Sequence, residues 1–168
     1  LLFAQRRAVH RTVAETLEHL YPDRTEEMVG LLAYHWDQAG YAERAIGYFL
    51  QAGEDARRAY ANGEAIRCFG RVLELVSELV QQAGGGRAHA QWQLEALRGL
   101  GQVHFGLGEL PEANRLFRQA IDLDPDLMFP PGKVPVHRHR QRDGLRSRHG
   151  HGKQLQEGGI ANLFLLGR

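Results

Sequence analysis

The sequence predicts an all-α protein made of about six helices packed as antiparallel pairs, and three observations lead to this fold class. Apolar residues recur every three or four positions through most of residues 3–124. Runs of alternating apolar and polar residues, which would indicate strands, are almost absent. A pattern of small and bulky residues also repeats along the chain, as shown below. The length of 168 residues suits one domain, and 43% hydrophobic residues can supply its core.

Helix-breaking residues mark where each predicted helix begins and ends. The helices are expected at about residues 3–20, 25–39, 42–60, 62–82, 88–107 and 111–124. Pro22 stops the first helix, and Gly40 ends the second. Three consecutive glycines at 84–86 are the strongest loop signal inside the chain. Pro111 suits the first turn of the last helix, which ends before Pro125.

Charge divides the chain into an acidic part and a basic tail. Residues 1–130 carry 13 arginines and 18 acidic residues, a net charge of −5, whereas residues 131–168 carry eight basic and two acidic residues, a net charge of +6. The tail is rich in Arg, Gly, His and Pro and has no helical periodicity, so we expect it to be mostly disordered. Because a GC-rich gene translated out of frame yields the same composition, a native origin and a frameshift both stay open.

These features define three predicted regions. Residues 1–25 form an N-terminal helix, which we expect to be the end of an upstream domain or the link from it, because the chain begins without Met inside a helix. Residues 26–128 form the helical repeats. Residues 129–168 form the low-complexity basic tail.

The repeated pattern occurs three times and is clearest at the end of the helical region. The last copy comprises Leu97, Leu100, Gly101, His104, Gly108, Ala113, Phe117, Ala120 and Pro125. An earlier copy has Val29, Leu32, Ala33, Trp36, Gly40, Ala45, Ile46, Phe49 and Ala52 at the same intervals. An overlapping copy has Phe49, Ala52, Gly53, Ala56, Tyr60, Ala65, Ile66, Phe69 and Val72. The predicted helix at 42–60 therefore serves two copies.

The residue types in this pattern are those that closely packed helices need. Gly or Ala where two helices cross lets their backbones approach, and aromatic residues or Leu fill the space beside the crossing. In the last copy, Gly101, Gly108 and Ala113 are expected to permit close contact. Phe117 and Ala120 are expected to fill the gap.

The pattern resembles the tetratricopeptide repeat, with Leu97 in place of the usual Trp and His104 in place of the usual Tyr. The resemblance covers about residues 26–127. It implies a solenoid of antiparallel helix pairs that binds a protein or peptide in its concave groove, or another domain of the same parent chain.

The first 82 residues show a wider resemblance. The stretches LLFAQRRAVHRTVAETLEHLYPD and YANGEAIRCF look like the helical region that follows the ATPase module in bacterial adenylate or guanylate cyclase-like proteins and multidomain ATPase regulators. This resemblance implies a sensor or scaffold segment, with any catalysis in other domains of the parent. No nucleotide-binding or cyclase residue can be carried over to this chain.

The sequence contains no catalytic constellation, so we predict a protein that is not an enzyme and needs no cofactor. The glycines between residues 99 and 108 fit neither phosphate-loop spacing, and neither Ser77 nor Ser147 lies in a nucleophile-elbow context. The single cysteine, Cys68, excludes an internal disulfide and fits a reducing compartment. No apolar run is long enough to span a membrane, so we expect a cytoplasmic protein without a membrane partner.

Two groups of residues contain potential metal ligands, but each is only a weak candidate for a metal site. Glu15 and His19 lie one helical turn apart, but two ligands on one turn often arise by chance. The tail histidines have no ordered surroundings, so adventitious binding is the better interpretation. These tail histidines are His137, His139, His149 and His151. We therefore predict no metal site.

The candidate binding residues lie on the concave face, which the first helix of each pair mainly lines. In the last copy they are Gln91, Glu95, Arg98, Gln102 and Phe105, and in the earlier copies Tyr34, Asp37, Gln38, Glu54 and Arg57. For any one of them a solvated polar face is an equal alternative. Some tetratricopeptide proteins hold a terminal carboxylate with Lys and Asn. No Lys precedes Lys133 here, so this clamp is not evident, although Arg could substitute.

Two other functions stay open at this stage. The tail arginines could bind nucleic acid or an anionic surface without sequence specificity, although no recognised nucleic-acid module is present. The chain could also be a passive linker within a larger ATPase.

Overall fold

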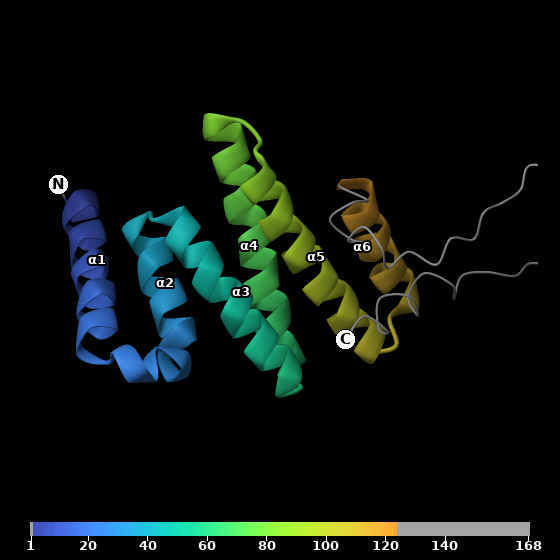
Figure 1. The fold of residues 1–168 in the computed structure, drawn as a ribbon, viewed down its shortest axis with the longest axis horizontal. Helices are drawn as coiled ribbons and strands as arrows, with labels where there is room; N and C mark the ends of the chain where they lie inside the picture. The colour runs from blue at the N-terminus through green and yellow to red at the C-terminus, as the bar shows by residue number, and fades with distance from the viewer. Residues whose placement is uncertain (1, 124–168) are drawn as a thin grey trace, which may run out of the picture.

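The computed structural model describes residues 2–123 and, over that range, is built entirely from helices and short turns (Figure 1). The elements are α1 (Leu2–Leu20), the 3-10 helix η1 (Pro22–Met28), α2 (Val29–Ala39), α3 (Ala42–Arg58), α4 (Asn62–Ala83), α5 (Arg87–Gly106) and α6 (Leu110–Leu123). No strand occurs among these residues. The predicted all-α fold is therefore confirmed, while the tail and Pro125 lie outside the described residues.

The helices follow one another along the long axis of the molecule in chain order (Figure 1). Each packs mainly against the next: α1 on α2, α2 on α3, α3 on α4, α4 on α5 and α5 on α6. In addition, α3 contacts α5 directly. This succession of antiparallel neighbours is the helix-pair solenoid that the repeat pattern predicts.

Left-handed glycines end three of the helices. Gly40, Gly84 and Gly108 follow α2, α4 and α5 and have φ values of 82°, 84° and 79°. A side chain at such a φ is strained, which explains glycine at these turns. Gly108 therefore belongs to the α5–α6 turn, and no atom lies within 4 Å of where its Cβ would be. The expectation that Gly108 permits a close helix contact is thus corrected.

The entry to the second helix differs from the prediction. Residues 22–28 form the 3-10 helix η1, and α2 begins only at Val29, after Met28 as N-cap. No side chain caps α2, so no capping hydrogen bond fixes its first turn there. The proline in the first turn of η1 also removes one backbone donor.

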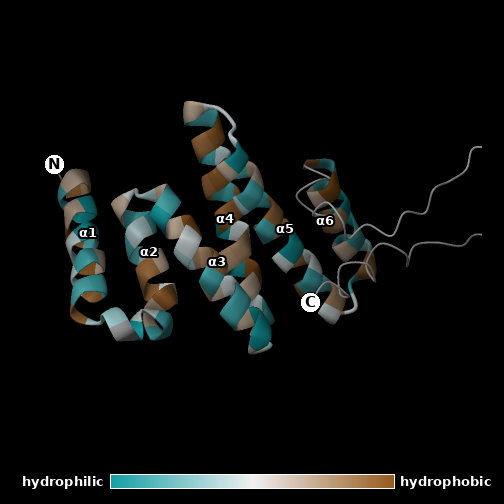
Figure 2. Cartoon of the chain, in the orientation of Figure 1, coloured by the Kyte–Doolittle hydropathy of each residue, from teal (hydrophilic) through white to brown (hydrophobic). Residues whose placement is uncertain are grey.

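The helices carry both hydrophobic and hydrophilic residues, as Figure 2 shows. The buried faces join into a core that runs from α1 to α6. Its largest fully buried side chains include Trp36, Leu32, Ile46 and Val72. Among residues 2–123, no helix has both the length and the apolar character that a membrane span requires.

Twelve of the predicted packing residues are buried in the structure. Those that are buried are Leu32, Trp36, Ala45, Gly53, Ala65, Phe69, Leu97, Leu100, Gly101, Ala113, Phe117 and Ala120. Phe49 and Ala52 are partly buried, and Gly40 lies in an exposed turn.

Two phenylalanine rings lie against glycines of neighbouring helices. A Cβ on Gly53 of α3 would lie 2.8 Å from Cε1 of Phe69, and a Cβ on Gly99 of α5 would overlap the same ring. Phe69 of α4 is thus held between glycines of two other helices. Similarly, a Cβ on Gly101 would overlap the ring of Phe117 on α6.

Candidate interaction surface

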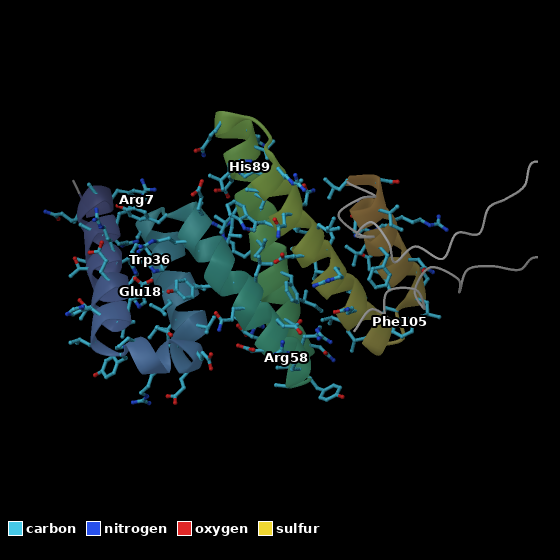
Figure 3. All side chains as sticks on the ribbon, in the orientation of Figure 1. Arg7, Glu18, Trp36, Arg58, His89 and Phe105 are labelled. Carbon is cyan, nitrogen blue, oxygen red and sulfur yellow. The ribbon has the colours of Figure 1, made fainter. Side chains whose placement is uncertain are left out.

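The ten candidate binding residues are spread over α2, α3 and α5. Tyr34, Gln38, Gln91 and Arg98 are exposed, whereas Asp37, Glu54, Arg57, Glu95, Gln102 and Phe105 are partly buried. Figure 3 shows Phe105 near the C-terminal end of α5, where its ring packs against Ala113 and Phe117. Phe105 therefore contributes to the α5–α6 contact.

Asp37 is held in an ion pair between α2 and α4. The guanidinium of Arg71 donates to both Asp37 carboxylate oxygens, at 2.9 and 3.0 Å, and to Glu74 at 2.7 Å. The Asp37 side chain is only 13% exposed. Hydrogen bonding to Asp37, more than any other contact, raises the pKa of Arg71 further above its usual value. This two-point contact fixes α2 against α4.

Glu54 and Arg57 form a second bidentate pair, within α3. Arg57 donates to the two carboxylate oxygens of Glu54 at 2.7 and 2.8 Å, and Arg58 donates to one of them at 3.1 Å. Hydrogen bonding from Arg57 lowers the pKa of Glu54 and keeps this carboxylate ionised. The pair presents a defined arrangement of charge on α3.

An open hollow of about 600 Å³ lies between α1, the α2–α3 turn and the C-terminal half of α4. Its lining residues are Arg7, Asp37, Gly40, Tyr41, Ala42, Glu43, Arg44, Arg71, Leu75, Glu78, Leu79 and Gln82. Arg7, labelled in Figure 3, lies so close to Gly40 that a Cβ there would overlap its guanidinium. Of the ten candidates, only Asp37 lines this hollow. The sequence pattern could not reveal it, because its walls come from three separate segments.

Glu18 joins α1 to α2 and α3. Its Oε1 accepts hydrogen bonds from Nε1 of Trp36 at 2.9 Å and from the hydroxyl of Tyr48 at 2.7 Å. Figure 3 shows Glu18 and Trp36 side by side. The guanidinium of Arg44 lies 3.4 Å from the other oxygen and 4.3 Å from the centre of the Trp36 ring. This cluster was not predicted, although a buried indole N–H needs an acceptor and was the signal available.

Tyr48 should be a late-titrating tyrosine. Burial, helped by its hydrogen bond to Glu18, raises the pKa of Tyr48 from 10.0 to about 12. The folded chain therefore keeps the phenol proton to a higher pH than the unfolded chain. The protonated Tyr48 therefore stabilises the folded state fully below pH 10, and this contribution is lost as the pH rises toward 12. Ultraviolet titration of tyrosinate should show a late phase that Tyr48→Phe removes. If that variant kept the phase, the assignment would be wrong.

A pair of histidines also connects α1 to α2. Nδ1 of His10 lies 2.9 Å from Nδ1 of His35, and the two ring centres are 5.0 Å apart. The ring of Tyr34 meets both imidazoles edge-on, at centre distances of 5.6 and 5.3 Å. Burial, and to a smaller extent His10, lowers the pKa of His35 and favours its neutral form.

The remaining reactive groups are held in structural contacts. Burial raises the pKa of the Cys68 thiol to about 11, so it stays protonated at neutral pH. Glu15 accepts a hydrogen bond from Arg11 at 2.7 Å. Within residues 2–123, no three metal-ligating side chains gather in one group.

Comparison with known proteins identifies one repeat. Residues 94–127 match the tetratricopeptide repeat family model, and the described part of this match comprises most of α5 and all of α6. No curated protein and no solved structure shows a significant match to the chain. The matched segment is the last copy of the repeated pattern. Residues 94–127 are therefore similar to a tetratricopeptide repeat, and they lie at the end of an all-α stack of helices.

Proposed function

We propose that this chain is a non-catalytic scaffold that binds a protein or peptide partner. The observation that carries the proposal is the tetratricopeptide match at residues 94–127 within a continuous stack of helices. Such repeats present extended surfaces that commonly hold a peptide or a helix. The proposed partner surface comprises the exposed polar residues of α2 and α5, together with the ion-paired Glu54 and Arg57 of α3.

The same proposal includes a cellular setting. The likeness of residues 1–82 to the region after the ATPase module in bacterial cyclase-like and ATPase signalling proteins supports a sensor or scaffold segment in the cytoplasm. The partner is then another protein or another domain of the parent chain.

Site-specific photocrosslinking tests the partner surface. A photoreactive amino acid at Arg98, exposed on α5, should crosslink to a discrete partner in an extract of the source cells. The matched control places it at Arg118, exposed on α6. Equal crosslinking at both positions would contradict the assigned face.

Removal of the tail separates this function from electrostatic binding. A variant that ends at residue 130 should keep the crosslink at Arg98. Binding that depends steeply on salt and disappears with residues 131–168 would instead favour nonspecific attachment to nucleic acid or another anionic surface. A chain with neither activity would be a passive linker.

A further inference from the structure

The His10 and His35 side chains meet across two helices in a way that the other described histidines do not. His89 accepts a hydrogen bond from the backbone N–H of Gly86 three residues earlier, and His104 pairs with Glu109 five residues later. By contrast, 25 residues separate His10 from His35, and their Nδ1 atoms face each other at 2.9 Å. The contact therefore depends on how α1 packs on α2.

The distance between the two nitrogens is suited to chelation. One neutral imidazole of the pair donates its Nδ1–H and the other accepts it, so the pair shares a single proton at this contact. If a metal ion lay about 2.0–2.1 Å from both nitrogens, the N–metal–N angle would be about 90°. That angle matches neighbouring positions of a square-planar or octahedral ion, whereas tetrahedral zinc would need the nitrogens about 3.3 Å apart.

We propose that His10 and His35 form a binding site for copper(II) or nickel(II) that clamps α1 to α2. Both ions favour imidazole ligands in such geometries. Water completes the coordination. The ring that donates at this contact moves its proton from Nδ1 to Nε2 by exchange with solvent, so both ligands bind as neutral imidazoles. The inference goes beyond the scaffold function, because it makes a metal ion strengthen the attachment of the N-terminal helix. Two ligands far apart in sequence have no spacing signature, so the pattern could not reveal this site.

Thermal unfolding with added Ni²⁺ tests the clamp. The test uses the full chain with the tail histidines replaced by glutamine, because those side chains can also bind the ion. Saturating Ni²⁺ should raise the Tm by roughly 5 °C or more over the value in EDTA. The substitution His10→Gln or His35→Gln should remove most of that rise. Glutamine retains a hydrogen-bonding side chain, so the metal-free variants should remain folded. The matched control, His19→Gln, should keep the full rise.

Electron paramagnetic resonance of bound Cu²⁺ gives a second measurement that does not depend on stability. In the same tail-substituted chain, one Cu²⁺ should show two nitrogen ligands, and each single substitution should leave one. The proposal is overturned if Ni²⁺ does not raise the Tm, if the rise survives both substitutions, or if Cu²⁺ shows fewer than two nitrogens.

Discussion

Replacing Phe69 by alanine should lower the free energy of unfolding by about 3–5 kcal/mol, the usual cost of removing a buried phenylalanine ring. The ring is 3% exposed and lies between Gly53 of α3 and Gly99 of α5. Neither glycine has a side chain that can fill the cavity, so the cost should fall at the upper end of this range. Urea unfolding followed by circular dichroism at 222 nm measures the change.

The control for this prediction is the same substitution at an exposed position. Phe3 is 76% exposed on α1, so Phe3→Ala should change the free energy by no more than about 0.5 kcal/mol. If Phe69→Ala leaves too little folded protein to measure, Phe69→Leu should give a smaller loss in the same direction. If Phe69→Ala and Phe3→Ala lowered the free energy of unfolding equally, the packing of Phe69 between α3 and α5 would contribute no more to stability than an exposed side chain does.

A single methyl group on Gly101 should destabilise the chain by about 1–3 kcal/mol. A Cβ at this position overlaps the ring of Phe117, which is fully buried on α6. Either the ring or α6 must then move away from α5. Differential scanning calorimetry of Gly101→Ala should therefore show a lower Tm.

Two further variants separate this steric effect from the helix preference of alanine. Gly47 lies exposed in α3, and no atom would come within 4 Å of a Cβ there. Gly47→Ala should therefore stabilise the chain by about 0.5–1 kcal/mol. Adding Phe117→Leu to Gly101→Ala should cost less than the sum of the two single changes, because the smaller side chain makes room for the methyl group. Strict additivity would count against the overlap.

The ends of the helices could be predicted because their signals are local. Pro22, Gly40 and the glycines at 84–86 act on the backbone at their own positions, and the structure ends helices beside each of them. The 3-10 turn of residues 22–28 was missed, since a proline followed by polar residues is equally typical of the first turn of an α-helix.

The packing pattern could be predicted in kind but not in detail. The repeat identifies Gly53 and Gly101 as small and Phe69 and Phe117 as large, and all four are buried. Which ring meets which glycine depends on how the helices are rotated about their axes. Periodicity within one helix does not determine that rotation, so the second glycine against Phe69, at position 99, was found only in the structure.

The same limit applies to the interaction surface. The repeat placed candidate residues on individual helices, yet the contacts of Asp37 with Arg71 and of Glu18 with Trp36 join distant segments. Charge spacing along one helix predicts pairs such as Glu54 with Arg57. Contacts between side chains of different helices can be predicted only once the arrangement of the helices is known.

Arginine provides all the fixed positive charge of the described helices, since the first lysine of the chain is Lys133. Reagents that modify amines therefore find side-chain targets only at Lys133 and Lys153, besides the α-amino group. Coupling to a surface through lysine would therefore attach the chain at residues that follow the described helices in sequence. No side chain among residues 2–123 would be modified, so the helix faces described above would stay open to a partner.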